Sequence, residues 1–182
     1  LHDALPISYL VECADELGAD VTIHRLANLA GPDPFFGFRT KIAFAHELVE
    51  MALLDRSIVL KSSPSTPRNM LPGSLFHHDI GTLLDRRSVE GRVDIFNLGS
   101  GSTSTMIGLA RKIAVMAEGN HGYPVSIEHP EESETQTQFH LDTTKIRLVA
   151  GVGVDDLASE LSMILQDVAA IHNPISTRGK PR

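Results

Sequence analysis

Short runs of β-branched residues alternate along the chain with amphipathic stretches, and this alternation restricts the available folds more than any other feature. The sequences VTIHRL (residues 21–26) and RVDIFNL (92–98) read as strands, and IVL (58–60) and PVSIEH (124–129) are shorter runs of the same kind. The amphipathic segments between them can each cross over a face of a sheet and return the chain for a parallel strand. The pattern predicts an α/β architecture with parallel strands.

Apolar residues three or four positions apart predict the helices. We expect helices at residues 9–17, 40–54, 106–118 and 157–171, a further helix capped by Ser74, and a short helix capped by Asp142. The segments ANLAGPDPFFGF and KSSPSTPRNMLPG are expected to be loops. The second of these is too rich in proline for a central strand.

The composition excludes several classes of function. The formal net charge is −7 and the basic residues are scattered, so the chain offers no basic surface for nucleic acid. The single cysteine, Cys13, rules out a disulfide framework and makes a reducing, cytoplasmic location the expected one. No apolar run reaches the roughly 18 residues that span a bilayer. The sequence thus predicts one ordinary globular domain that binds neither nucleic acid nor membrane.

The turn GSGSTS (residues 99–104) lies between a predicted strand and a predicted helix, where backbone N–H groups can bind phosphate. Ser104 stands where the dinucleotide fingerprint has a third small residue, usually glycine, and the turn lacks the lysine of a P-loop. A tight turn capped by Ser or Thr is therefore favoured. The phosphate-binding alternative makes the chain a complete small α/β nucleotide-binding protein, with Glu128 as its ribose partner.

Two loops carry polar side chains that are suited to an anion. Asn28 directly follows a predicted strand, at the carboxyl edge where α/β sheets bind ligands. Arg68 lies among small residues and prolines, where a guanidinium can pair with a phosphate. The adjacent residues His77, His78 and Asp79 do not converge on one ion when they lie on a helix, so no metal site is predicted.

The run YLVECADELGADVTIHRLANLAGP resembles the stretch that follows the Tyr-x-x-x-Lys motif of extended short-chain dehydrogenases, the NAD-dependent epimerase/dehydratase family. Arg68 is similar to that family's substrate-facing arginine, and FNLGSGSTSTMIGLARKI is similar to its N-x-G-x-G segment. The resemblance extends from Tyr9 to about Ile171. It implies the C-terminal part of a doubly wound, Rossmann-like fold with a small substrate-binding subdomain and without the first βαβ units.

Within this resemblance the first residues do not fit. The catalytic Tyr and Lys of the family correspond to positions 4 and 8, which here hold Ala4 and Ser8. A widely used sequencing adapter encodes LHDALPI when it is read from its first codon. We therefore expect residues 1–8 to be an artefact, residues 9–172 to be the C-terminal portion of one epimerase/dehydratase-like domain, and residues 173–182 to be a disordered tail.

The resemblance implies a function for the parent protein. The expected activity is an NAD- or NADP-dependent epimerase or dehydratase reaction on a nucleotide-linked sugar, and this fragment is expected to be inactive because the catalytic residues precede it. Asn28 and Arg68 would hold the substrate diphosphate, while Ala27 and Leu29 would line the nicotinamide pocket. The parent enzyme is expected to be a homodimer.

One departure from the family pattern weakens the sugar-nucleotide prediction. Family members often continue from the arginine to a Val-Asp-Asp segment, but this chain has GSLF (residues 73–76) and no acid there. A fragment of a carbonyl-reducing extended short-chain reductase is therefore an alternative to the epimerase or dehydratase.

Overall fold

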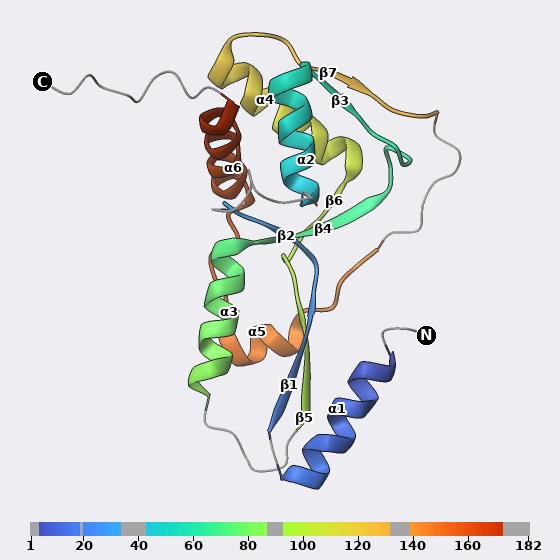
Figure 1. Cartoon of the computed structure of the whole chain (residues 1–182), viewed down its shortest axis with the longest axis vertical. Helices are drawn as coiled ribbons and strands as arrows, with labels where there is room; N and C mark the ends of the chain where they lie inside the picture. Colours follow the sequence, from blue (N-terminus) through green and yellow to red (C-terminus); the bar gives the residue numbers. More distant parts are fainter. Residues whose placement is uncertain (1–3, 19, 34–42, 87–92, 132–138, 173–182) are drawn as a thin grey trace, which may run out of the picture.

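The computed structural model describes residues 4–18, 20–33, 43–86, 93–131 and 139–172, and these residues form helices and strands in alternation (Figure 1). The helical elements are α1 (Ala4–Leu17), α2 (Phe44–Glu50), the π-helix η2 (Met51–Asp55), α3 (Gly73–Asp85), α4 (Met106–His121), α5 (Thr144–Ala150) and α6 (Leu157–His172). The strands are β1 (Val21–Leu26), β2 (Asn28–Ala30), β3 (Ser57–Val59), β4 (Pro67–Pro72), β5 (Val93–Leu98), β6 (Thr103–Thr105) and β7 (Ser126–Glu128). None of the described helices is both long and apolar enough to cross a membrane.

Three pairs of the described strands run parallel, as the alternating pattern predicts, and two of them are β1–β5 and β3–β7. β1 and β5 lie side by side in the lower part of Figure 1, in register from Val21 opposite Val93 to Leu26 opposite Leu98. β3 pairs in parallel with β7. In both pairs, helices and other strands separate the partners in the chain, which a parallel connection requires. The prediction of a mixed α/β fold with parallel sheets is confirmed.

The proline-rich segment that was expected to be a loop contains the central strand of a sheet. β4 lies between β2 and β6, so this prediction was wrong. Pro67 and Pro72 stand at the two ends of β4, which leaves the backbone N–H groups between them free to pair. The neighbours also divide the strand: β6 pairs antiparallel with residues 67–69, and β2 pairs parallel with residues 70–72. Within ANLAGPDPFFGF, residues 28–30 form β2 rather than a loop.

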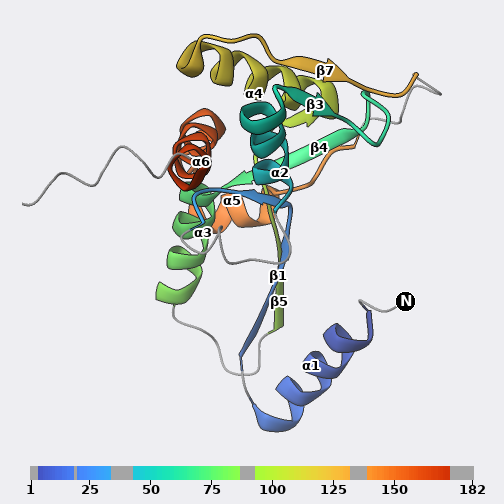
Figure 2. The ribbon, with the colours of Figure 1, turned by 45° about the horizontal axis from the view of Figure 1, so that its top comes forward.

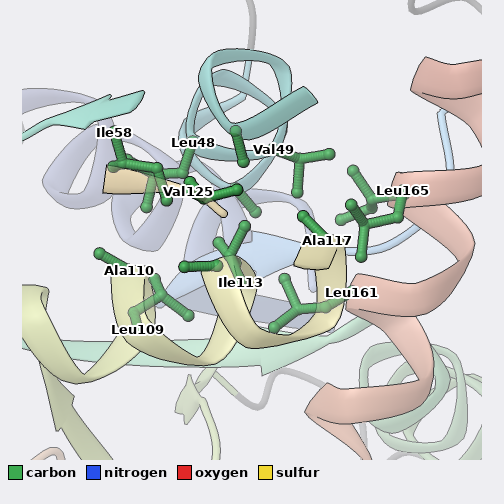
Figure 3. Packing of buried hydrophobic residues seen from close by; sticks show 14 of the residues in the cluster. Leu48, Val49, Ile58, Leu109, Ala110, Ile113, Ala117, Val125, Leu161 and Leu165 are labelled. Atoms are coloured by element: carbon green, nitrogen blue, oxygen red, sulfur yellow. The ribbon is translucent and has the colours of Figure 1, made fainter. Parts of the chain in front are cut away.

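The main hydrophobic core lies between α2, α4 and α6, and Figure 3 shows its side chains meeting from all three helices. Leu48, Ile113 and Leu161 are at most 2% exposed. Burial of each such side chain contributes about 1.5–3 kcal/mol. Ala30 of β2 and Met70 of β4 belong to the same cluster. The core therefore fixes the two strands that contain Asn28 and Arg68.

A second, smaller core joins α3 and α5 to β5. Its buried members are Leu71, Leu75, Phe96, Leu98 and Ile146. Beside this core, the Arg147 guanidinium on α5 forms an ion pair with the fully buried carboxylate of Asp79 on α3. These contacts attach the two helices to the face of the β1–β5 pair.

Two of the helix starts agree with the expected capping. Thr105 Oγ1 accepts a hydrogen bond from Gly108 N at 3.1 Å at the start of α4. Before α5, Asp142 Oδ1 accepts from Thr144 N at 2.9 Å. Hydrogen bonds from the Thr144 side chain and backbone lower the pKa of Asp142. Both caps satisfy N–H groups that the first turn of a helix leaves without partners.

The cap expected for α3 differs from the prediction. The helix begins at Gly73, so Ser74 lies inside the first turn and its hydroxyl makes no capping bond there. The backbone N–H of Ser74 instead donates to Glu160 Oε1 of α6 at 2.7 Å. At the start of α3, a backbone N–H group is therefore capped by a carboxylate 86 positions away in the sequence, and not by the hydroxyl of Ser74.

Other helix boundaries shift by a few residues. α1 begins at Ala4, so residues 4–8 of the expected artefact continue the helix predicted at 9–17. The helix expected at 40–54 is described from Phe44, with a change to π-helical bonding at Met51, and its residues 40–42 lie outside the described part. The tail predicted at 173–182 also lies outside it.

Apolar side chains are exposed on α1, which lies apart from the other helices in both views (Figures 1 and 2). Tyr9, Leu10 and Leu17 are 67%, 46% and 78% exposed. At the end of the adjacent β1, Leu26 is 50% exposed. Within the described residues, β1 has β5 as its one strand partner, so the other edge of β1 is open. Soluble proteins normally cover such a surface.

Candidate anion-binding site

A pocket of about 540 Å³ lies at the carboxyl end of the β1–β5 pair, where parallel α/β sheets bind ligands. Arg25 and Asn97, which are opposite each other in the parallel register, both line it. Asn28 contributes from β2 and Arg68 from β4. Phe139 and Leu141 form an apolar part of the wall. The pocket therefore combines guanidinium and amide groups with one apolar side.

The structure brings together Asn28 and Arg68, the two residues that the sequence assigns to the substrate. They lie 40 positions apart in the chain and line the same pocket because β2 and β4 pair side by side, with Asn28 opposite Met70. Asn28 Nδ2 donates to Asn69 O at 3.2 Å, and Arg68 Nη1 donates to Pro67 O at 3.2 Å. Further N–H groups of both side chains can therefore bind a ligand.

The sequence did not identify Asn69, whose buried amide organises this part of the site. Its Nδ2 donates to Ser100 O at 2.9 Å and to Ser102 O at 3.1 Å, and its Oδ1 accepts from Ser100 N at 2.9 Å. A Cβ at Gly99 would lie 2.6 Å from Asn69 Oδ1. Gly99 is thus required for close packing against Asn69. No local sequence signal identifies such a contact, because it spans 31 residues.

The GSGSTS turn directs its hydrogen-bond donors to a carboxylate of the protein itself. Asp155 Oδ2 accepts from Ser100 Oγ at 2.7 Å and from Gly101 N at 3.1 Å. The short strand β6 begins at Thr103, inside this segment, and separates its two glycines from the start of α4, unlike in a phosphate-binding loop. This arrangement favours a structural turn.

Glu128, the expected ribose partner in the nucleotide-binding alternative, lies on β7. It accepts from Ser57 Oγ at 3.4 Å across the β3–β7 pair. The pocket of about 200 Å³ beside the GSGSTS turn is lined by Ser100 and Asp155, and Glu128 does not belong to it. The observed geometry gives the alternative no support.

The electrostatic character of the larger pocket is positive, although the chain as a whole is acidic. Arg25 and Arg68 line it, and its described lining contains no carboxylate. Among the described residues, neither guanidinium forms an ion pair. Next to Arg25, burial lowers the pKa of His24, so this imidazole adds no charge at neutral pH. The pocket is suited to an anion that can accept from two guanidinium groups.

The two residues predicted to line a nicotinamide pocket line two different pockets. Ala27 lines the same pocket as Asn28, and its backbone N–H donates to Leu98 O at 2.9 Å. Leu29 is 44% exposed and lines a neighbouring pocket on the other side of β2. Their assignment to a cofactor stays a prediction.

No family model matches the sequence, and no curated protein matches it. Solved structures do match. The UDP-N-acetylglucosamine 4-epimerase from Methanobrevibacter ruminantium in complex with UDP-N-acetylmuramic acid aligns with a TM-score of 0.71 and 15% identity, over 90% of this chain and 50% of that chain. The UDP-glucuronic acid 4-epimerase from Bacillus cereus in complex with UDP-glucuronic acid and NAD aligns with a TM-score of 0.68 and 15% identity, over 90% and 50%.

A third solved structure also matches the chain. The UDP-glucose 4-epimerase from Thermotoga maritima with UDP-glucose aligns with a TM-score of 0.67 and 19% identity, over 91% of this chain and 51% of that chain. The chain spans about half the length of the solved structures that it matches. It therefore has the Rossmann-like α/β fold of these nucleotide-sugar epimerases over about half of their length.

Proposed function

We propose that the chain is the substrate-binding part of an NAD(P)-dependent epimerase or dehydratase that acts on a nucleotide-linked sugar. The observation that carries the proposal is the convergence of Asn28 and Arg68 on one pocket at the carboxyl end of parallel strands. A diphosphate carries acceptor oxygens for both the amide and the guanidinium. The structural neighbours with bound UDP-sugars have the same fold.

The described residues fit only one side of the cofactor in this proposal. Ala27 and Leu29 follow β1 and would line the nicotinamide ring, which supplies hydride transfer when it is bound. The GSGSTS turn is not suited to the cofactor phosphates, because Asp155 already accepts from its donors. The dinucleotide phosphates must then bind to another part of the parent enzyme.

Proton transfer also requires groups that this part of the chain does not have. Ala4 and Ser8 stand where the resemblance places the catalytic Tyr and Lys. An alanine side chain has no group that can remove a substrate hydroxyl proton, and a serine hydroxyl does not carry the positive charge of the lysine. We therefore expect no catalysis by the chain alone. Its residues bind and orient the diphosphate.

The open edge of β1 supports the proposal that another half of the enzyme packs there. Within the described residues that edge has no strand partner, and Leu17 and Leu26 beside it are exposed. A parallel strand added at this edge would continue the sheet and cover apolar surface. The chain aligns with about half the length of each of these neighbours, which is consistent with that arrangement.

The segment GSLF lacks the acid that family members often have there, but in the folded chain a carboxylate from another element lies beside it. Glu160 of α6 places its carboxylate at the start of α3, within 2.7 Å of Ser74 N. A carboxylate is therefore present beside this segment although the local sequence lacks one. Glu160 lines a different pocket from Asn28 and Arg68, so this carboxylate does not distinguish the sugar-nucleotide proposal from a carbonyl-reducing reductase.

A titration of the isolated chain with UDP-glucose and with NAD tests the proposal. We expect UDP-glucose to bind, and Arg68→Gln to weaken binding about 10- to 100-fold, because a hydrogen bond to a charged group is worth about 1.5–3 kcal/mol. Arg111→Gln, an exposed arginine on α4, is the matched control and should leave the affinity unchanged. Micromolar binding of NAD, or an unaltered affinity in Arg68→Gln, would contradict the proposal.

A further inference from the structure

A second pocket, of about 530 Å³, lies on the other side of β2 from the anion-binding pocket. Successive residues of a strand point to opposite faces, and here Asn28 lines the first pocket whereas Leu29 lines the second. Phe76 of α3 and Met163 of α6 add to its apolar wall. The polar groups in it include the carboxylates of Asp33 and Glu160. The two pockets thus differ in charge.

Glu160 is the residue that gives this second pocket its character. It is 3% exposed, although it carries a carboxylate. Oε1 accepts from Ser74 N at 2.7 Å, at the positive end of the 13-residue helix α3. Oε2 lies against two glycines: a Cβ on Gly31 would be 3.2 Å from it, and a Cβ on Gly73 would be 3.4 Å from it.

The second carboxylate oxygen is available to a ligand. Oε2 has no hydrogen-bond partner among the described residues. A buried carboxylate is costly unless both oxygens are satisfied, and the helix end satisfies one of them. The remaining oxygen belongs to a side chain that lines the pocket. A group that donates a hydrogen bond, and above all a cation, would complete its bonding.

The lining selects against other ligand classes. No lysine or arginine lines the described part of this pocket, and its ionisable side chains are the carboxylates of Asp33 and Glu160 and the imidazoles of His46 and His77. The backbone N–H of Ser74, in the first turn of α3, could attract an anion, but it already donates to Glu160 Oε1. The described residues contain no group of three or more side chains placed to hold a metal ion. The free oxygen of Glu160 therefore favours a ligand that brings a hydrogen-bond donor with a positive charge on an organic body.

We propose that this pocket binds a small organic cation, a primary ammonium or an amidinium on an apolar body. Its N–H group donates to Glu160 Oε2, and its hydrocarbon part contacts Leu29, Phe76 and Met163. The site is separate from the anion-binding pocket and shares Leu29 with the surface assigned to the nicotinamide in the proposed function. Cation and anion sites on the two faces of β2 give the chain two ligands of opposite charge.

Saturation-transfer NMR with benzylamine as the probe tests this proposal. Benzyl alcohol, which has the same shape without the charge, and benzoate, which has the opposite charge, are the comparison probes. We expect benzylamine to bind with a dissociation constant on the order of millimolar, which is normal for a ligand of this size. Benzyl alcohol should bind at least about tenfold more weakly, and UDP should not compete with benzylamine.

Variants identify the site. Glu160→Gln should weaken benzylamine binding at least about tenfold, and Glu12→Gln on the exposed face of α1 is the charge-matched control that should leave it unchanged. Leu29→Lys changes a residue that is 44% exposed, so the fold is kept while a tethered ammonium occupies the pocket. This variant should abolish binding and decides the question if Glu160→Gln fails to fold. Equal binding of benzylamine and benzyl alcohol, no saturable binding of benzylamine, or wild-type binding in Leu29→Lys would overturn the proposal.

Discussion

The side chain of Asn69 connects β4 to the turn that follows β5, and it does so from a buried position. One amide satisfies the carbonyls of Ser100 and Ser102 and the N–H of Ser100. Its backbone carbonyl also accepts from Asn28 Nδ2. The pocket wall that contains Asn28 and Arg68 therefore depends on a residue that need not touch the ligand.

Replacement of this amide measures its contribution. Asn69→Ala should lower the free energy of unfolding by about 2–3 kcal/mol, because it leaves buried backbone groups of the turn without partners. Urea denaturation gives the value. Asn28→Ala, which removes one exposed amide, is the comparison and should cost about 1 kcal/mol or less. A loss in Asn69→Ala no larger than in Asn28→Ala would show that the turn does not need this clamp.

A second residue-scale prediction concerns pH. Burial lowers the pKa of His24 below the usual 6.5, so the folded chain binds fewer protons than the unfolded chain when the pH falls through that range. Neutral His24 therefore makes its full contribution to the free energy of unfolding above about pH 6.5. This contribution is lost as the pH falls toward the lowered pKa of the folded state. Urea midpoints at pH 7.5 and 5.5 should differ less in His24→Gln than in the wild type. An identical difference would contradict the assignment.

The site residues divide into those that local sequence identifies and those that it cannot. Asn28 was found because it directly follows a predicted strand, and Arg68 because it lies among small residues and prolines. Asp155 and Glu160 were missed because their partners lie 54 to 86 positions away. A carboxylate on an amphipathic helix, such as Glu160, normally indicates a solvated face, and only the tertiary fold places this one against a helix end.

At the level of elements, β4 shows how tertiary pairing overrides a local rule. Two prolines in six residues indicate a loop, yet both occupy strand ends and the neighbouring strands each pair with half of β4. The strands β1 and β5 were predictable because their patterns are long and alternating. β2 and β6, three residues each, carry no such pattern and form because β4 lies between them.

The ion pair between α3 and α5 gives a prediction for these elements. Arg147→Met should lower the free energy of unfolding by about 3–5 kcal/mol, because it leaves the buried carboxylate of Asp79 without its guanidinium partner and with His78 Nδ1, at 3.3 Å, as its remaining side-chain contact. Asp79→Asn combined with Arg147→Met should restore part of the loss.

The control is the exposed pair of Lys61 and Glu47, in which the two side chains are 84% and 45% exposed. Lys61→Met should change the free energy of unfolding by less than about 1 kcal/mol. Urea denaturation compares the two pairs. Equal effects of Arg147→Met and Lys61→Met would mean that α5 is not attached to α3 through this contact.

For the whole molecule, the alternation of strands and helices was sufficient to predict an α/β fold with parallel strands. It did not predict that the described strands form three small sheets of two or three strands. The division follows from the short strands at β2, β3, β6 and β7, whose pairing is decided by packing around α2, α4 and α6. Hydrophobic patterns specify which face is buried, but not which strands become neighbours.

The exposed apolar surface of α1 and β1 should affect how the isolated chain behaves. We expect it to bind the hydrophobic dye anilinonaphthalene sulfonate and to self-associate as its concentration rises. Leu17→Glu should reduce both effects, because Leu17 is 78% exposed on α1. Val115→Glu, at a 67% exposed position on α4, is the control and should reduce them less. If the isolated chain is a monodisperse monomer that binds no dye, this contradicts the proposal that another part of the parent enzyme covers the surface of α1 and β1.

The most direct test of the account is a double-mutant cycle of Asn28→Ala and Arg68→Gln, with the affinity for UDP measured by calorimetry. If both side chains bind one diphosphate, each single variant weakens binding and the effects are not additive, with a coupling of about 0.5–3 kcal/mol. Independent, additive effects, or an affinity that neither variant changes, would contradict a shared anion-binding site.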